Sequence, residues 1–335
     1  MNKVLYLGNK FYNYKKVNSV LETLEPLFSE FCIIKTASDK KNQVFRFLHM
    51  AYYFFRYGLK TNKIIIDVYS TKAFYFAFIF AYLSIVFNKK YILFLHGGNL
   101  PERFHKSPIL TKAILKKAYK IIAPSFYLQS FFQDKGFKVN RIPNIIELDK
   151  YPFKLRKKVG PSLLAIRGFG KPYNPLMTLK AVNELKISIP DIRLLMIGNK
   201  EDYHYYEVIN FIEKNHLQNI VTIQPKCTRD EWVVLSQNYD IMISNPVIDN
   251  TPVSLIEGMA LGMCIITTKV GGIPYLVSEN ECLLLEANDV AGLTQGILHL
   301  IRQPDYACQL SNNSRKKAEE FDWKIIKKKW MEVLN

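Results

Sequence analysis

Apolar residues along this chain follow two alternating patterns: short continuous runs, and longer segments in which they recur every three to four residues. In the first half the short runs lie at residues 4–8, 31–35, 64–68, 91–95 and 121–125, and helical spacing is found near 17–28 and 49–57. Continuous apolar runs separated by helical segments are typical of parallel strands that are buried on both faces. The pattern predicts an α/β fold built from βαβ units.

The same pattern starts again after a charged, irregular stretch at residues 149–158. Strands are predicted at 163–166, 193–197, 221–224 and 241–243, and helices at 177–185, 203–215, 231–237, 289–302, 305–320 and 321–334. A chain of 335 residues suits two domains. We therefore expect an N-terminal domain at 1–150, a C-terminal domain at 151–305, and closing helices at 306–335, the last of which packs back on the first domain.

The most informative stretch is residues 249–274, DNTPVSLIEGMALGMCIITTKVGGIP. We expect a short helix with Thr251 as its N-cap, Pro252 as its first residue and Gly262 as its C-terminal stop. Glu257 is the one charged residue of this apolar helix, and its side chain leans toward the helix N-terminus, which favours anions such as phosphate. With Asp249 in the entering loop, the stretch suits a nucleotide diphosphate that carries a sugar. A buried βα unit in which Glu257 is a satisfied core residue fits this stretch equally well.

A run of 15 uncharged residues at 73–87 is short of the ~20 that span a bilayer. A buried crossover helix is the expected structure, and a helix lying against a membrane is the alternative. The five cysteines are scattered without a C-x-x-C pair, and the N-terminus does not resemble a signal peptide, so we expect a cytoplasmic protein.

The net charge of +17 is concentrated in the first half. Residues 1–150 contain 24 Lys+Arg and 9 Asp+Glu, whereas residues 151–335 contain 22 and 20. Such asymmetry favours an anionic partner for the first half, although a merely soluble basic surface would look the same. Lys112, Lys116 and Lys120 have the spacing of one basic helix face, which we expect to suit acidic lipid headgroups.

Further candidate site residues follow predicted strands. His96 and Gly97 follow the strand at 91–95, where open α/β sheets bind ligands. Arg167 and Lys171 lie in the loop after the strand at 163–166, where two cations could stabilise a departing diphosphate. No G-x-G-x-x-G follows the first strand, so a nicotinamide or flavin site has no support. No D-x-D triplet or His/Asp cluster with metal-ligand spacing occurs either, so we expect no metal.

These motifs, taken in order, resemble the retaining glycosyltransferases of family 4, which have the GT-B fold. The resemblance extends over nearly the whole chain. It rests on the glycine turn at Gly8, His96-Gly97, Pro124-Ser125, Ile142-Pro143-Asn144, Arg167 with a nearby Lys, Gly198, the acid-x7-acid element of Asp249 and Glu257, Gly271-Gly272-Ile273-Pro274, and Phe321-Asp322-Trp323. It implies two Rossmann-like domains whose parallel sheets face each other across a cleft.

The resemblance also implies roles for individual residues. Glu257 would bind the nucleotide ribose, Asp249 the donor sugar, and Arg167 and Lys171 the diphosphate. His96 would lie near the reacting sugar. The remaining positions are the backbone of Val253, Ser254 and Leu255 at the diphosphate, Gly198, Gln224 and Lys226 near the nucleotide, and Gly8 and Gly97 on the acceptor side. The chain departs from the family pattern at Asp249, which is usually Glu, at Lys171, which usually lies one or two residues later, and after Gly198, which a second glycine usually follows.

We therefore expect a metal-independent retaining glycosyltransferase of the hexosyltransferase type. Its donor would be a UDP- or GDP-linked sugar, and its acceptor an oligosaccharide or lipid-linked glycan of surface-polysaccharide synthesis. It would bind the anionic inner face of the cell membrane as a peripheral protein. The alternatives are a nucleotide-sugar epimerase of the same fold and a non-catalytic sugar-nucleotide-binding protein. Nothing in the sequence indicates nucleic-acid binding.

Overall fold

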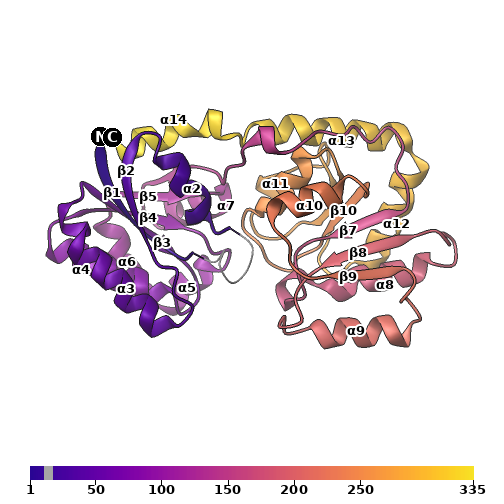
Figure 1. Cartoon of the computed structure of the whole chain (residues 1–335), viewed down its shortest axis with the longest axis horizontal. Helices are drawn as coiled ribbons and strands as arrows, with labels where there is room; N and C mark the ends of the chain where they lie inside the picture. The colour runs from indigo at the N-terminus through magenta and orange to yellow at the C-terminus, as the bar shows by residue number, and fades with distance from the viewer. Residues whose placement is uncertain (11–17) are drawn as a thin grey trace. The chain divides into compact units, whose positions relative to one another are not determined.

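The computed structural model describes residues 1–10 and 18–335 of the chain. These residues form two compact units, one of Met1–Asn144 with Ile326–Asn335 and one of Ile145–Ile325 (Figure 1). Each unit contains one six-stranded sheet, and all strand pairs in both sheets are parallel. The predicted α/β fold is therefore confirmed for both halves of the chain.

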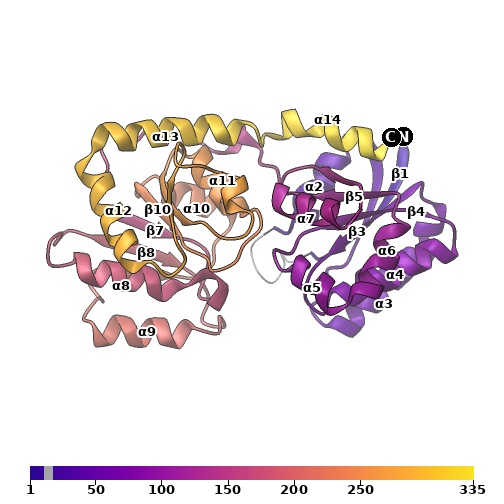
Figure 2. The same cartoon turned by 180° about the vertical axis from the view of Figure 1, so that it is seen from behind.

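The first sheet has the order β2-β1-β3-β4-β5-β6. Its strands are β1 (Asn2–Leu7), β2 (Cys32–Ala37), β3 (Lys63–Val68), β4 (Lys90–Leu95), β5 (Lys120–Ala123) and β6 (Val139–Arg141). The helices are α2 (Val20–Phe28), α3 (Gln43–Arg56), α4 (Phe74–Val86), α5 (Leu100–Lys106), α6 (Pro108–Lys116) and α7 (Phe126–Asp134). The predicted helix at 17–28 includes residue 17, which lies outside the described residues. Helices α3, α4 and α6 cover one face of this sheet, and α2 lies on the other (Figure 2).

The second sheet has the order β12-β11-β10-β7-β8-β9. Its strands are β7 (Ser162–Ala165), β8 (Arg193–Ile197), β9 (Val221–Gln224), β10 (Ile241–Ser244), β11 (Cys264–Thr268) and β12 (Leu283–Leu285). The helices are α8 (Pro175–Leu185), α9 (Tyr205–Lys214), α10 (Arg229–Ser236), α11 (Val253–Ala260), α12 (Val290–Arg302), α13 (Pro304–Glu319) and α14 (Trp323–Leu334). Successive strand residues point to opposite faces, so Leu163 packs with α8 and α12 while Leu164 packs with α10 and α11.

The strand order creates one topological switch point in each sheet. In the first unit the chain runs outward from β1 to β2 and then crosses back to β3, so the carboxyl ends of β1 and β3 adjoin an open crevice. In the second unit β7 and β10 have the same relation. Ligands bind open α/β sheets at such points. Gly8 follows β1, and Arg167 follows β7, so the chain places candidate residues at both switch points.

One predicted helix is shorter than expected. Helix α6 ends at Lys116, and Lys120 is already the first residue of β5, where it pairs with Ile92. The backbone leaves the helix because Tyr119 N–H donates to the Tyr91 carbonyl and so begins the sheet ladder. The predicted face of Lys112, Lys116 and Lys120 is therefore wrong as a continuous helix face.

The last helix, α14, continues from the second unit into the first. Trp323 belongs to the second unit, whereas residues from Ile326 onward pack with the first. Trp330 is fully buried there, with its ring centroid 5.0 Å from that of Phe28 and 5.2 Å from that of Phe94. In the described ranges, residues 1–10 and 18–335, no helix has the length and apolar character needed to cross a membrane.

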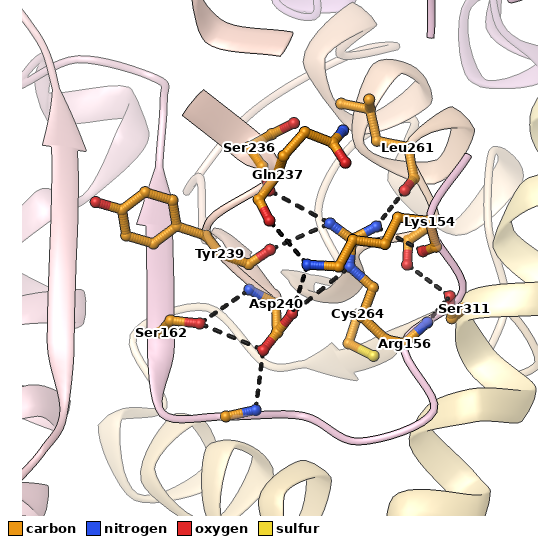
Figure 3. Close-up of polar contacts among 12 residues, drawn as sticks. Lys154, Arg156, Ser162, Ser236, Gln237, Tyr239, Asp240, Leu261, Cys264 and Ser311 are labelled. Carbon is orange, nitrogen blue, oxygen red and sulfur yellow. Dashed lines mark hydrogen bonds and ion pairs between the residues drawn. The ribbon is translucent and has the colours of Figure 1, made fainter. Parts of the chain in front are cut away.

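A buried arginine holds the carbonyl ends of two helices of the second unit (Figure 3). Arg156 donates to the carbonyls of Lys154, Ser236 and Leu261, and the last two lie at the C-terminal ends of α10 and α11. Its Nε lies 3.8 Å from a carboxylate oxygen of Asp240. Burial lowers the pKa of Arg156, and Asp240 opposes that shift. Since positive charge is favourable at helix C-termini, Arg156 fixes the position of α11 from the end opposite the candidate site.

Candidate functional site

The N-terminal end of α11 is the centre of the candidate site in the second unit. The helix begins at Val253 with Pro252 as its N-cap, so the predicted cap at Thr251 is one residue too early. Leu255 N–H donates to the Pro252 carbonyl over 3.1 Å. The N–H groups of Val253 and Ser254 have no acceptor among the described residues. These two donors, rather than all three expected, are therefore available to an anion. Gly262 has a φ of +69° and ends the helix as predicted.

Arg167 connects this helix end to the entering loop. Its Nη1 donates to Ser254 Oγ over 3.1 Å, and its Nη2 forms an ion pair with Asp249 Oδ2. The guanidinium also lies over the Tyr173 ring, 4.6 Å from the centroid. Arg167 and Asp249 meet because they follow β7 and β10, the two strands at the switch point. A cation fixed beside two helix N–H groups is suited to bind a diphosphate.

Glu257 lies deeper on the same helix and is 7% exposed. Its Oε1 accepts a hydrogen bond from the Tyr151 hydroxyl over 2.7 Å and lies 3.3 Å from Arg229 Nε. Its Oε2 has no hydrogen-bond partner in the part of the chain that the structure describes. Burial raises the pKa of Glu257, and Arg229 and Tyr151 oppose that shift. One carboxylate oxygen is thus held by protein groups while the other can accept from a ligand hydroxyl.

Two adjacent glycines hold the loop that carries Asp249. Gly271 has a φ of +54°, and a Cβ there would come within 2.0 Å of the Asp249 carbonyl oxygen. A Cβ at Gly272 would come within 2.1 Å of the Asn250 carbonyl oxygen. Gly272 N–H in turn donates to the Asp249 carbonyl over 3.1 Å. The V-G-G-I-P motif therefore supports the acidic loop directly, which explains why the two segments occur together.

The remaining predicted donor-side residues surround a second acid. Asp202 accepts from the backbone N–H of Phe169 and Asn199, and its Oδ1 lies 3.5 Å from Lys226 Nζ. A Cβ at Gly198 would come within 2.6 Å of the Phe169 ring, so this glycine permits close packing. Its N–H donates to the Gln224 carbonyl. Gly198, Gln224 and Lys226 therefore lie close together at the carboxyl ends of β8 and β9.

Lys171 differs from the other predicted cations. It begins a 3-10 turn and is exposed, and its ammonium forms no ion pair within residues 1–10 and 18–335. The structure therefore brings together Arg167, Asp249, Ser254 and Glu257, but it does not place Lys171 against them. Lys226, which follows β9 and lies 3.5 Å from Asp202, is instead the lysine held near the ends of the strands.

The first unit has its own polar cluster at the switch point. Asp67, in β3, accepts hydrogen bonds from the hydroxyls of Tyr6 over 2.8 Å and Tyr69 over 3.3 Å. Its Oδ1 lies 2.7 Å from His96 Nε2. The pKa values of both tyrosines are raised, mainly by burial and next by the negative charge of Asp67. A carboxylate that orients an imidazole at a strand end is suited to proton transfer or to binding a hydroxyl group.

Gly8 and Gly97 adjoin this cluster. A Cβ at Gly8 would come within 2.3 Å of an Asp67 carboxylate oxygen, and one at Gly97 within 3.0 Å of the Ser70 backbone nitrogen. The predicted acceptor-side residues Gly8, His96 and Gly97 therefore lie around Asp67, which sequence reasoning missed. The available signal was its position: Asp67 is the only acid between Asp39 and Glu102.

The three predicted membrane-surface lysines lie elsewhere in the first unit. Lys112, Lys116 and Lys120 line a hollow of about 560 Å³ together with Lys135 and Lys138. None of the five ammonium groups pairs with a carboxylate in the described part of the chain. The three lysines therefore lie close together as expected. Lys112 and Lys116 belong to α6 and Lys120 to β5, so they are not on one helix face.

Comparison with known proteins agrees with this architecture. The family model described as "Glycosyl transferases group 1" matches residues 149–317. An uncharacterized glycosyltransferase of Methanocaldococcus jannaschii is 28% identical over 158 residues, which are 46% of this chain and 44% of that protein. The chain thus matches less than half the length of this relative.

Two solved structures resemble the whole chain. Sucrose-phosphate synthase from Thermosynechococcus elongatus has a TM-score of 0.81 at 15% identity, over 99% of this chain and 98% of that one. HepE of Anabaena, solved with UDP-glucose, has a TM-score of 0.77 at 16% identity, over 100% and 99%. These likenesses establish the fold as GT-B. Because the family model covers half of the chain, the chain belongs to the group 1 glycosyl transferases.

Proposed function

We propose that this protein transfers a sugar from a nucleotide-diphosphate sugar to an acceptor hydroxyl with retention of anomeric configuration, as a member of family 4. The observation that carries the proposal is the position of Arg167 and Asp249 beside the first turn of α11. The HepE structure, which contains UDP-glucose, supports a nucleotide sugar as the donor. A UDP- or GDP-linked hexose is the proposed donor class.

The donor would bind the second unit through its diphosphate. Arg167 and the N–H groups of Val253 and Ser254 would donate hydrogen bonds to the diphosphate and stabilise the negative charge that grows on it as the sugar leaves. Glu257 Oε2 would accept from the ribose hydroxyls. Asp249 would contact the donor sugar, and it would have to share or exchange its ion pair with Arg167 when the donor binds.

The acceptor would bind the first unit near Asp67 and His96. We propose attack on the same face of the sugar from which the diphosphate departs, with the leaving phosphate taking the acceptor proton. No residue is assigned as a covalent nucleophile. His96, oriented by Asp67, would position the acceptor hydroxyl or the reacting sugar.

No metal is required in this proposal. Arg167 and the helix N-terminus supply the positive charge that a divalent cation would otherwise provide. Within residues 1–10 and 18–335, no group of three or more His, Cys, Asp or Glu side chains is placed to hold a metal ion. Full activity in EDTA is the expected result, and activity that EDTA abolishes and Mg²⁺ or Mn²⁺ restores would contradict the proposal.

The proposed acceptor is a lipid-linked glycan of surface-polysaccharide synthesis, used by a peripheral protein at the inner face of the cell membrane. The excess of Lys and Arg in residues 1–150 supports it, because a lipid-linked diphosphate and the membrane that carries it are both anionic.

An epimerase acting on a nucleotide sugar is the second candidate, and the Asp67–His96 pair favours it because that pair could move protons. Product analysis separates the two. Incubation with UDP- and GDP-linked sugars should release the nucleoside diphosphate slowly in the absence of acceptor. Interconversion of sugar nucleotides would indicate an epimerase, and unchanged donors that still shift the unfolding temperature would indicate a binding protein.

Glu257→Ala should weaken donor use in the transferase by about 2–4 kcal/mol, because a charged hydrogen bond in a buried site is lost. Steady-state kcat/KM for donor hydrolysis measures this loss. An unchanged kcat/KM would reject the placement of the ribose at Glu257.

A further inference from the structure

We propose that the outer face of α3 and α4 lies against an anionic lipid bilayer. This surface, the α3–α4 face, consists of exposed apolar side chains: Val44, Phe45, Leu48, Tyr52 and Phe55 of α3, Tyr75, Tyr82, Ile85 and Val86 of α4, and the adjoining Phe87. The proposal deepens the function given above, and it rests on that function only for the nature of the acceptor.

Helix α3 is apolar on two opposite sides. Met50 and Phe54 are buried against the sheet at 3% and 0% exposure, whereas Phe45 and Tyr52 on the outer side are 64% and 57% exposed. Residues 44, 45, 48, 52 and 55 recur with helical spacing, so they form a stripe rather than scattered positions. Single exposed apolar residues are ordinary, but a continuous stripe marks an interaction surface.

Helix α4 extends the stripe to a broader surface. Its 13 residues include no charged side chain, and yet Tyr82 and Val86 are 58% and 60% exposed. Helices α3 and α4 lie side by side on the outside of the same sheet face, and the rings of Phe55 and Phe87 meet at 5.9 Å between centroids (Figure 1). At 13 residues, α4 is too short to span a bilayer, so its apolar outer face suits a helix lying in the interface.

The charge around this face selects an anionic partner. Between residues 40 and 101 the chain has nine Lys and Arg and a single acid, Asp67, which is buried. Exposed cations lie close to both ends of the two helices, among them Lys41, Arg56, Lys72 and Lys90. Apolar and aromatic side chains bordered by Lys and Arg are typical of surfaces that bind anionic lipid headgroups. A second copy of this chain would bring like charges together, which disfavours self-association through the same face.

The same two helices also line the acceptor side of the first unit. Their inner residues Met50, Phe76 and Phe80 line a small hollow together with Gly8 and Asp67. Helices α3 and α4 therefore separate the proposed bilayer contact from Asp67 by the thickness of one helix layer, about 10 Å. This geometry links membrane binding to acceptor delivery.

Co-sedimentation of the full chain with vesicles tests the proposal. Vesicles of phosphatidylcholine with 30% phosphatidylglycerol should bind the protein at low salt, and pure phosphatidylcholine vesicles should bind it far less. The double variant Phe45→Ser with Phe55→Ser should lower the partition coefficient for the vesicles about tenfold, which corresponds to ~1.4 kcal/mol. The matched control is Ile187→Ser with Val234→Ser, two residues of the second unit that are 84% and 68% exposed, and it should bind as the unchanged protein does.

Three outcomes would overturn the proposal. The first is absence of binding to anionic vesicles at low salt. The second is loss of binding in Lys112→Glu with Lys116→Glu but not in the phenylalanine variant, since the lysine hollow would then be the contact. The third is a dimer, seen by light scattering, that the phenylalanine variant dissociates. Donor hydrolysis, which needs no membrane, should be equal in all variants. Its absence from the unchanged protein would instead count against the proposed function.

Discussion

Glu257 is an ionisable side chain that is almost fully buried in the first turns of α11. Burial raises its pKa, so the folded protein holds the proton more tightly than the unfolded chain does. The contribution of Glu257 to stability therefore falls as pH rises from its ordinary pKa through the raised value. A carboxyl group whose ionised form is disfavoured by burial is expected to serve a ligand rather than the fold.

Glu257→Gln should separate those two roles. The variant should unfold at pH 7 at the same temperature as the unchanged protein or at a higher one, because a neutral amide replaces a carboxyl group whose ionised form is disfavoured by burial. It should lose at least half of the stabilisation given by a UDP-linked sugar. Thermal unfolding with and without donor at pH 5 and pH 7 measures both effects. A variant that is less stable at pH 7 but keeps the full donor effect would show that Glu257 is structural.

Asp67 allows a test of the proposed acceptor side. Asp67→Asn keeps the size of the side chain but removes the charge that faces His96 Nε2 at 2.7 Å. We expect kcat for transfer to fall by more than tenfold, or about 1.4 kcal/mol or more. Donor KM should be unchanged, because the donor residues belong to the other unit. A parallel rise in donor KM with unchanged kcat would contradict a role on the acceptor side.

The residues of the candidate site differ in how far sequence could reveal them. Arg167, Asp249 and Glu257 stand out because each is charged and follows a predicted strand or interrupts an apolar helix. Tyr151 and Arg229 carry no such signal. They reach Glu257 from 106 and 28 positions away along the chain, and only the folded backbone brings them there. Asp67 carries no such signal either, because its partners Tyr6 and His96 lie in β1 and directly after β4.

Among the elements, α11 depends on Arg156 at its C-terminal end as much as on its first turn. Arg156→Met should remove one hydrogen bond from each of the carbonyls of Leu261 and Ser236 and leave Asp240 without its arginine. Breaking a buried ionic network by removing one partner costs about 3–5 kcal/mol. Chemical denaturation should show this loss in the second unit. Lys154→Met, at an exposed neighbour in the same cluster, should cost less than 1 kcal/mol.

Element boundaries were predictable where the pattern was continuous. The strand expected at 193–197 is β8 with the same bounds, because a short apolar run lies between Arg193 and Gly198. The helix expected at 49–57 begins six residues earlier, since Asn42 caps it and apolar residues continue outward from there. The prediction of one helix face with Lys112, Lys116 and Lys120 was wrong because i, i+4 spacing does not indicate the residue at which a helix ends.

At the scale of the whole molecule, the closing helix α14 joins residues that are distant in sequence. Residues from Ile326 onward complete the core of the first unit, although they follow the entire second unit in the chain. Lys63 and Lys120 also donate to the carbonyls of Val333 and Glu332 at its end. Periodicity predicted the helix itself, because Trp323 and Trp330 lie one heptad apart. No local pattern could show which aromatic rings receive Trp330.

This arrangement makes the stability of the first unit depend on the last ten residues. Trp330→Ala should remove the buried ring from between Phe28 and Phe94 and cost about 3–5 kcal/mol. Because the two units have separate cores, the loss should appear as an earlier unfolding step for residues 1–144, whereas the step that a UDP-linked sugar stabilises should stay in place. Scanning calorimetry with limited proteolysis at intermediate temperature would identify which unit opens first. Ile325→Ala, at a side chain that is 56% exposed and directly precedes these ten residues, is the matched control and should leave both steps unchanged. A single transition that moves as a whole in Trp330→Ala, together with its donor dependence, would mean that the two units unfold as one body and that α14 couples them.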